Sequence, residues 1–444
     1  MKSLLESYAK RIKVAEAVYA KEHDGEAMSK AKKLTLATVL NNTNKFLTEA
    51  FDNSVGTNAR DIGNYKKFVL NLTNIAMPNL LAFDLVMVKP MTSRAGFVTY
   101  IDFVAGSNKG GVAQGDVFNS GLKGLGKMDA ARMAYTGAKV VEDAVAKATT
   151  AWKPVVQHSK DGTTFEVEIY AGLDSQGEAI WTPAMVADVN EGDKIRYEYD
   201  NVVIPQEDLP ILNAVTRDIP IAAKTRRIAI YYSQIAAFEM KNEMGEDLGQ
   251  NLSEQAVGEL KYEIDSEVVM FLRKMAGEPV AELQFNKHIP VGITLAQHYE
   301  GFGEKLEQAK VALYNRTQRY MPSYMVCASD VLPILAYCPT FKMGNMKAIS
   351  GPFVAGTLGG LKVVVSPLIA SGEYFFGVNE GMASAAIYAP YMAILPTQLL
   401  GFADGAMSQG FSTMYGLEAL NPELLIAGKV VDEVADGAVA VING

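Results

Sequence analysis

The stretch LSEQAVGELKYEIDSEVVMFLRKMA, residues 252–276, is the longest continuous helical pattern in this sequence. Its apolar residues recur mostly every three or four positions, which places them on one face of a helix. They are Leu252, Val257, Leu260, Ile264, Val268, Phe271 and Met275. Asn251, followed three residues later by Glu254, is typical of a capping box, and Gly277 is a natural helix stop. At about 1.5 Å per residue this helix is roughly 37 Å long, and a helix of that length is more often a structural spine than a site.

The residues before this helix divide into a helical region and a β-rich region. Apolar stripes at helical spacing cover residues 3–22, 28–50 and 58–76, which predicts an N-terminal helical arm. The runs FDLVMVKPM (83–91) and GFVTYIDFV (96–104) are rich in β-forming residues and are separated by a short polar turn. This arrangement predicts a β-hairpin.

The glycine-rich stretch that follows, residues 106–126, has little apolar content of its own. It cannot build a core there, so we expect an extended loop that needs support from elsewhere. Residues 150–205 contain several short β-like runs separated by turn signals such as KDG, SQG and EGD, which predicts a small β-rich insertion. The run IPIAAKTRRIAIYYS (219–233) reads as a long strand leading toward the long helix.

Helical and strand patterns alternate after the long helix, from about residue 295 to 405, which predicts an α/β domain. Within it, EYFFGV and AIYAPYMAIL (386–395) read as a central pair of strands. Its expected core residues are Ile387, Met392, Ile394 and Leu395. A last segment, Gly416 to Val431, is expected to return as a strand to the earlier sheet.

Two tyrosines flank a proline in AIYAPYMAIL and mark a structural joint. Pro390 cannot donate a hydrogen bond to a β-ladder, so we expect it at an interruption or an edge. Tyr388 and Tyr391 are expected to pack their rings and to hydrogen-bond their hydroxyls at a domain or subunit seam, and not to line a pocket.

The composition is that of a folded protein of 444 residues with 49% hydrophobic and 20% charged residues. No apolar run reaches the roughly 18 to 20 residues that cross a bilayer, and the N-terminus has no signal-peptide pattern, so we expect no membrane contact and a cytoplasmic protein. Cys327 and Cys338 form neither a disulfide framework nor a zinc motif. The net charge of −9 argues against a basic nucleic-acid-binding surface.

Motifs that would carry catalysis, a cofactor or a metal are weak. GLKGLGKM (121–128) resembles a phosphate-binding loop, but Met128 stands where a serine or threonine should bind magnesium. The four histidines lack metal-ligand spacing, and GAMSQG (405–410) misses the spacing of a nucleophile elbow. We therefore predict no catalytic, cofactor-binding or metal-binding residues, and a nucleotide-binding enzyme is only a weak alternative.

One charged constellation favours contact between subunits. Glu259, Glu263 and Glu267 lie at i, i+4 and i+8 of the long helix, which is usually a solvated face. If they are functional, we expect them to attract a basic segment from a neighbouring subunit. Lys109, Lys123 and Lys127 in the glycine-rich loop are the candidate partners.

Several segments, in chain order, resemble one known family. PNLLAFDLVMVKPMTSRAGFVTYI resembles the beginning of its extended loop, and AKTRRIAIYYSQIAAFEMKNEMGEDLGQNLSEQAVGELKYEIDSEVV resembles its strand and spine helix. VAGTLGGLKVVVSP, EYFFGVNEG and AAIYAPYMAIL resemble three later segments, although Glu380 replaces a lysine of the family pattern. The family is that of the major capsid proteins of tailed bacteriophages, with the Hong Kong 97-type capsid fold, in its T-even-type myovirus branch.

The resemblance implies an α+β fold with a helical arm, an extended loop, a peripheral domain containing the spine helix, and an axial α/β domain. The β-rich insertion has no counterpart that the resemblance identifies. The expected division of the chain is 1–60 arm, 61–83 start of the peripheral domain, 84–148 extended loop, 149–205 insertion, 206–294 peripheral domain, 295–405 axial domain, and 406–444 return to the peripheral domain.

The resemblance also implies a function: a virion shell, assembled in the bacterial host cytoplasm, that encloses double-stranded DNA without sequence-specific binding. The expected partners are copies of the chain itself in hexamers, with pentamers as a further capsomer, and portal, scaffold, vertex or decoration proteins. An encapsulin-like nanocompartment shell is the alternative within the fold. Leu47, Thr48 and Glu49 match a short prohead-protease pattern, but we favour an arm that is not cleaved there.

Overall fold

The computed structural model describes the chain in two compact units. One unit contains residues 1–99, 122–124 and 218–444, and the other contains residues 100–121 and 125–217. The described residues are 2–22, 26–52, 69–70, 73, 77, 80–108, 111–120, 124–126, 132–133, 135, 140–145, 155–159, 166–173, 179–181, 194–198, 211–243, 245, 248–344, 351–380, 383–397, 399–402 and 405–432.

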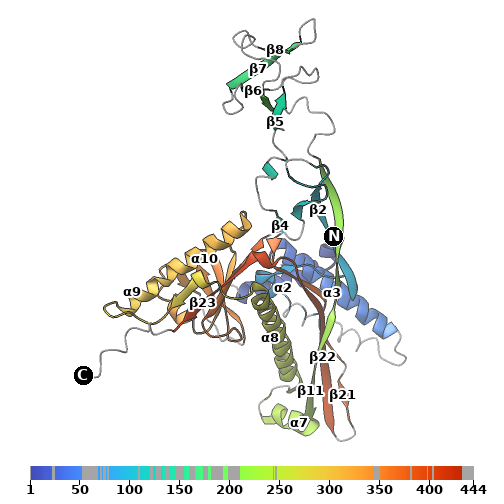
Figure 1. The fold of residues 1–444 in the computed structure, drawn as a ribbon. Coiled ribbons are helices and arrows are strands. Elements are labelled where there is room, and N and C mark those ends of the chain that lie inside the picture. Colours follow the sequence, from blue (N-terminus) through green and yellow to red (C-terminus); the bar gives the residue numbers. More distant parts are fainter. Residues whose placement is uncertain are drawn as a thin grey trace, which may run out of the picture. The chain divides into compact units, whose positions relative to one another are not determined.

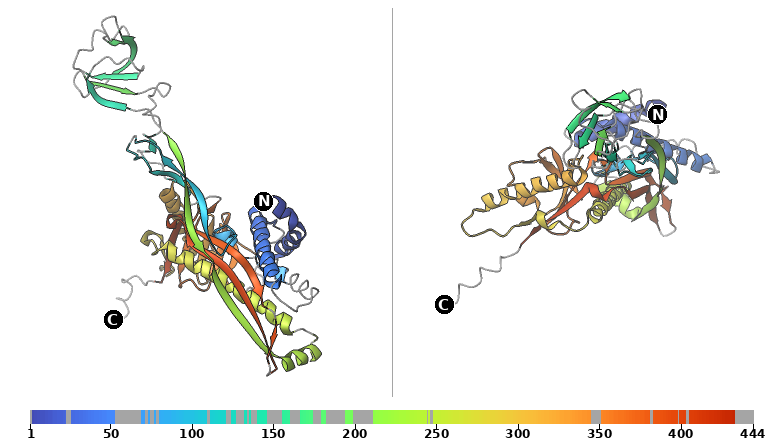
Figure 2. Two further views of the ribbon diagram at one scale, coloured as in Figure 1. Left: turned by 90° about the vertical axis from the view of Figure 1, so that its right-hand side faces the viewer. Right: turned by 45° about the horizontal axis from the view of Figure 1, so that its top comes forward.

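Three N-terminal helices form the arm of the first unit: α1 (Lys2–Ser7), α2 (Ala9–Glu22) and α3 (Lys30–Asp52). Figure 2 shows them lying together. Their apolar faces are buried, with Ala15, Ala37 and Leu40 almost fully inaccessible to solvent. These side chains belong to the same hydrophobic cluster as the core of the C-terminal half, so the arm is packed into the unit.

The long helix α8 (Leu248–Ala276) has 29 residues and begins four residues earlier than the pattern predicted. At about 1.5 Å per residue it is roughly 43 Å long. It lies beside a sheet in the order β1–β20–β22–β11, with β21 also pairing with β22 (Figure 1). Leu260 of α8 packs against Ile394 and Phe411 of this sheet. The strands are β1 (Met87–Val88), β20 (Ala386–Pro396), β21 (Leu400–Gly401), β22 (Ala406–Ala419) and β11 (Lys224–Ser233).

A seven-stranded mixed sheet forms the α/β part of this unit, in the order β12–β23–β17–β13–β16–β15–β14. Its central strand β13 (Tyr324–Ala328) is buried at every position, as expected for a strand covered on both faces. The other strands are β12 (Gln284–Asn286), β14 (Phe341–Met343), β15 (Phe353–Leu358), β16 (Leu361–Ser366), β17 (Glu373–Gly377) and β23 (Leu425–Val431).

The remaining elements of the first unit are short apart from two helices. α7 (Gln234–Glu243) joins β11 to α8, and α10 (Phe302–Thr317) contributes Phe302, Leu306 and Leu313 to the main core. The short elements are α5 (Ala82–Leu85), α9 (Leu295–Glu300), α11 (Leu332–Leu335), β18 (Asn379–Glu380) and β19 (Ala383–Ser384).

Two sheets lie wholly or partly in the second unit. One has the order β10–β2–β3–β4, with strands β2 (Ala95–Ala105), β3 (Val117–Ser120), β4 (Gly124–Leu125) and β10 (Leu212–Ala222). The other has the order β5–β9–β6–β7–β8. Its strands are β5 (Val140–Val145), β6 (Val155–Ser159), β7 (Glu166–Leu173), β8 (Ala179–Trp181) and β9 (Lys194–Glu198). The β-rich sheet therefore includes β5, which the sequence assigned to the extended loop.

The predicted hairpin between residues 83–91 and 96–104 is wrong. β1 pairs in parallel with β20, whereas β2 pairs antiparallel with β3. The N–H groups of Lys89 and Met91 donate to the carbonyls of Tyr388 and Pro390, both on β20. Pro90 lies between these donors, where its missing N–H costs no hydrogen bond to β20.

The predicted pairing of EYFFGV with AIYAPYMAIL is also wrong. β17 has β13 on one edge and β23 on the other, and β20 has β1 and β22. Neither strand has a free edge for the other. The expected return strand at 416–431 is likewise divided between β22 and β23, which belong to different sheets.

The glycine-rich stretch does have a small core, contrary to expectation. Val112 and Phe118 pack with Ala105 and Tyr135. The rings of Phe118 and Tyr135 are 4.9 Å apart, and the Tyr135 hydroxyl donates to the carbonyl of Ile211 at 2.5 Å. Tyr135 lies beyond the glycines in the chain, so this core depends on a residue that the local composition does not include.

Candidate assembly surface

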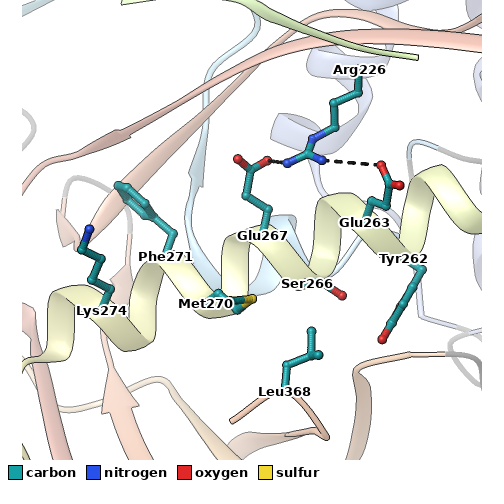
Figure 3. Close-up of a pocket in the computed structure, with 9 residues that line it drawn as sticks. All are labelled: Arg226, Tyr262, Glu263, Ser266, Glu267, Met270, Phe271, Lys274 and Leu368. Carbon is teal, nitrogen blue, oxygen red and sulfur yellow. Dashed lines mark hydrogen bonds and ion pairs between the residues drawn. The ribbon is translucent and has the colours of Figure 1, made fainter. Parts of the chain in front are cut away.

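Arg226 on β11 binds two of the three predicted glutamates of the long helix. Its guanidinium lies 2.7 Å from a carboxylate oxygen of Glu267 and 3.5 Å from one of Glu263. It also donates from Nε to the hydroxyl of Tyr415, on β22, at 2.5 Å, and that hydroxyl donates to Glu267. One side chain therefore joins α8 to two strands, as Figure 3 shows for the two ion pairs.

The electrostatics of this cluster follow from partial burial. Burial raises the pKa of Tyr415, and its hydrogen bond to Glu267 raises it further. Burial lowers the pKa of Arg226, but the hydrogen bond and charge of Glu267 raise it overall. The tyrosine therefore stays neutral and the arginine stays charged, so the cluster is a structural bridge and not a proton-transfer pair.

A groove of about 610 Å³ runs along α8 beside this cluster. Met270, Phe271 and Leu368 form its apolar part, with Glu263, Glu267 and Arg226 among its charged lining and Lys274 farther along the helix (Figure 3). Tyr262 and Ser266 complete the lining. Such a surface suits an extended apolar segment that carries charge, because it combines apolar contact with ion pairing.

The structure describes the three predicted glutamates but not their predicted lysine partners. Glu259 is exposed, whereas Glu263 and Glu267 are half-buried. Lys109, Lys123 and Lys127 lie outside the described residues. Arg226 was not expected in this cluster, and nothing in the sequence distinguishes it from Lys224 and Arg227, the two other charged residues of the same strand pattern.

The tyrosine–proline stretch lies within β20, between β1 and β22. Tyr388 is buried, and its ring is 5.2 Å from that of Tyr415. The register with β22 shifts between Pro390 and Met392, so Pro390 marks an irregularity within the strand. Tyr391 is only half-buried and packs at the edge of the cluster formed by Leu47, Val69, Met392 and Leu395.

The side chain of Asn42 ties the arm to this same region. Its amide donates to the carbonyl of Met91 at 2.7 Å and to that of Tyr391 at 2.9 Å. Five residues farther along α3, Leu47 is buried against Met392 and Leu395. Glu49, of the protease pattern, follows within the same helix, whose end is Asp52.

Asp84 and Asp265 are two further buried or shielded acids that the sequence analysis did not single out. Asp84 lies 3.5 Å from the amine of Lys32 on α3 and 3.1 Å from that of Lys362 on β16. Asp265 is buried on α8 and accepts a hydrogen bond from the N–H of Leu81 at 2.9 Å. Asp84 of α5 therefore contacts both α3 and β16, and Asp265 joins the spine helix to the residue before α5.

Among the described residues, no group of three or more histidine, cysteine, aspartate or glutamate side chains could hold a metal ion. Within that same part of the chain, no helix is both long and apolar enough to cross a membrane.

Comparison with known proteins identifies the family. The sequence pattern described as "Major capsid protein Gp23" matches residues 62–438. The major capsid protein of Enterobacteria phage T4 is 24% identical over 405 residues, covering 80% of this chain and 75% of its own. That of Enterobacteria phage T6 is 24% identical over 409 residues, covering 80% and 78%.

Solved phage structures are similar at lower identity. A chain from Microbacterium phage Oxtober96 covers 79% of this chain and 90% of its own, with 8% identity and a TM-score of 0.37. A chain from the capsid of Myoviridae phage XM1 covers 70% and 90%, with 6% identity and a TM-score of 0.34.

These findings define the chain as a structural protein of a phage shell, and its structure has the expected mixture of helices and sheets of an α+β fold. More particularly, it belongs to the Gp23 family and is a major capsid protein of a T-even-like myovirus. Its location is therefore the capsid of the virion, and it builds that capsid by self-assembly. The predicted family, fold class and function are confirmed, and the encapsulin-like alternative is set aside.

Proposed function

We propose that copies of this chain form hexamers, with pentamers as a further capsomer, that close into an icosahedral shell around packaged double-stranded DNA. The family match carries this proposal. A net charge of −9 supports a DNA contact that is neither tight nor sequence-specific, because phosphate neutralisation supplies most of the affinity for DNA. We also propose that a portal, a scaffold and vertex or decoration proteins complete the particle, and that the chain itself catalyses no reaction.

The extended loop supplies one contact in this proposal, by reaching over a neighbouring subunit. Its Lys109, Lys123 and Lys127 would approach the acidic face of the neighbour's α8. Because Arg226 already binds Glu263 and Glu267, Glu259 is the residue of the three whose charge is most exposed. The apolar groove along α8 adds area that such a loop could cover.

The arm would remain part of the mature subunit. Its apolar side chains belong to the main core, and Leu47 is buried against β20. A protease that cut after Glu49 would have to unwind the end of α3, and release of residues 1–49 would expose that core.

Electron microscopy of the purified protein tests the assembly proposal. We expect closed shells, tubes or hexamers, and intact mass measurement of their subunits should show that residues 1–49 are retained. A protein that stays monomeric at every concentration and ionic strength tested would refute the shell. Shells made only of subunits that begin at Ala50 would refute the retained arm while leaving the shell proposal standing.

A further inference from the structure

The groove along α8 contains a buried hydroxyl that has no hydrogen-bond partner. Ser266 lines the groove and is 8% exposed, and its Oγ bonds no group in the described part of the chain. By contrast, Ser253 of the same helix donates to the carbonyl of Gly249, four residues earlier, at 2.6 Å. Buried polar groups are nearly always satisfied, so the Ser266 hydroxyl is available to a ligand that enters the groove.

The apolar wall of the groove is also uncovered. Met270 and Leu368 are 55% and 42% exposed, although both side chains are large and apolar. Figure 3 shows Ser266 and Met270 projecting from α8 on the side where Leu368 lies. Lys274, near the C-terminal end of α8, is exposed and makes no ion pair with a described residue. The groove therefore offers a ligand apolar contact, one hydroxyl and one unpaired cation.

Strand β23 ends beside this groove. The N–H of Val430 donates to the carbonyl of Gly372 at 2.6 Å. Gly372 lies in the turn between β16 and β17, and the same turn carries Leu368 into the groove. Glu373, the first residue of β17, pairs with Arg273 of α8 at 2.7 Å. The chain that follows β23 therefore starts close to both walls of the groove.

The sequence after β23 suits such a groove. Residues 433–444, EVADGAVAVING, lie outside the described residues. Two acids, Glu433 and Asp436, come first, and the uncharged run AVAVI (438–442) follows. Twelve extended residues span up to about 40 Å, whereas the α8 residues that line the groove extend over only about 18 Å of helix. Segment 433–444 is therefore long enough to reach along the groove.

We propose that segment 433–444 folds back along α8 of its own subunit and occupies this groove. Its two acids face Lys274, and its apolar run covers Met270 and Leu368. One of its backbone carbonyls accepts a hydrogen bond from the Ser266 hydroxyl. This inference goes beyond the proposed function, because it concerns a contact within one subunit.

Charge and tethering favour this segment over the extended loop of a neighbour. The loop lysines carry the same sign of charge as Lys274, whereas the acids of the segment carry the opposite sign. A segment tied to the groove by a few residues has an effective concentration on the order of millimolar, and it is present before any assembly. The loop then contacts α8 at Glu259, whose charge is exposed, and not in the groove.

Zero-length cross-linking of the full-length subunit tests the charged contact. A carbodiimide joins a carboxylate to an amine only when the two groups touch, so peptide mass spectrometry should find Lys274 linked to Glu433 or Asp436 within one chain. The variant Glu433→Gln/Asp436→Asn should lose this link. Lys287 and Asp432, which lie 3.2 Å apart, are the internal control and should link in both proteins.

Oxidation of Met270 tests the apolar contact. The variant Val439→Asp/Val441→Asp places two charges in the apolar run and should release it from the groove. Hydrogen peroxide should then oxidise Met270 at least about threefold faster than in the wild type, because methionine oxidation follows exposure. Met321, which is 48% exposed and does not line the groove, is the control and should react at the same rate in both proteins. The variant should keep the circular dichroism spectrum, since both valines follow the last described strand.

A sample in which the control pair links but Lys274 does not would overturn the inference, and so would equal oxidation of Met270 in the wild type and the valine variant. Links that form only between subunits would assign the groove to the segment of a neighbour and overturn the contact within one chain. Protection of Met270 that appears only on assembly would assign the groove to the neighbour's loop, with the same consequence. A subunit that never assembles would refute the proposed function and leave this inference standing, because the cross-links and oxidation rates are measured before assembly.

Discussion

Arg226 connects three elements through one guanidinium, and its partners are all acids or hydroxyls of the same chain. Its removal would leave Glu263 and Glu267 side by side on α8 without the cation between them. A fully exposed ion pair contributes little to the stability of a protein. Arg226 is half-buried, however, and it also donates a hydrogen bond to Tyr415.

We therefore expect Arg226→Ala to lower the free energy of unfolding of the free subunit by about 1–2 kcal/mol. Urea denaturation at fixed pH and salt measures this. Arg227→Ala, at the exposed neighbouring position, is the control and should change stability by less than about 0.5 kcal/mol. An equal loss of stability in the two variants would mean that the ion-pair cluster does not stabilise the subunit.

Asp265 makes the stability of the subunit depend on pH. The pKa of its carboxyl is raised from 3.8 to about 7, chiefly by burial and also by the charge of Asp84, against the opposing effects of Lys261 and of the N–H groups of Leu81 and Ala82. Because the folded-state pKa lies above the unfolded value, the folded chain holds the proton more tightly. This contribution to stability is complete below about pH 4 and is lost as the pH rises to about 7.

Asp265→Asn should remove this dependence. From pH 4 to pH 8 the wild type should lose stability relative to the variant by up to about 4 kcal/mol, since one pKa unit corresponds to about 1.4 kcal/mol. Urea midpoints measured at both pH values for both proteins give the difference. Parallel pH profiles for wild type and variant would show that Asp265 is not the titrating group.

At the scale of elements, one buried amide adds polar contacts to the packing of α3 on β20. Asn42 satisfies two backbone carbonyls, those of Met91 and Tyr391, from a buried position. Neither hydrophobic periodicity nor helix propensity indicates these hydrogen bonds, because asparagine has a low helix propensity and is normally expected to be exposed on a helix.

Asn42→Ala should therefore lower the free energy of unfolding by about 1–3 kcal/mol, the cost of leaving buried polar groups without a partner. Limited proteolysis should also cut the arm faster. Asn41→Ala, at the preceding position of the same helix, controls for helix propensity. An equal loss of stability in both variants would contradict a specific role for the Asn42 amide.

At the scale of the whole molecule, the proposed contact between subunits involves charges on two copies. Reversing Lys109, Lys123 and Lys127 to Glu should block assembly while the free subunit stays folded, because three negative charges would then approach the acidic face of the neighbour's α8. Particle yield by sedimentation measures the first effect and circular dichroism the second.

A compensating change sharpens this test. Adding Glu259→Lys to the triple variant should restore part of the particle yield, since Glu259 is exposed and its reversal does not disturb Arg226. Unchanged yield in the triple variant would refute the lysine contact. A blocked triple variant that Glu259→Lys does not improve would show that the lysines meet some other surface.

Local patterns predicted the elements well where one face of an element is buried along its length. The spine helix was found because its apolar spacing continues over many turns, and Leu260, Ile264 and Val268 are indeed buried. The predicted core of AIYAPYMAIL was also correct, with Ile387, Met392, Ile394 and Leu395 all buried. These features depend on residues within one element, and a single sequence contains that information.

The pairing of the elements was predicted poorly, and so was the site. A β-rich run predicts a strand that joins a sheet. Each strand has two edges, however, and the sequence of the run does not indicate which other strands will pair with those edges. β1 therefore pairs with β20 and not with β2, and β17 and β20 lie in different sheets. Arg226, Tyr415 and Glu267 are likewise far apart in the chain and meet only when α8 packs on β11 and β22. The sequence by itself determined the family, the helices and the buried faces, because these follow from local periodicity and ordered motifs. Tertiary structure alone decided strand partners and the ion-pair cluster, because both depend on which surfaces of distant segments fit together.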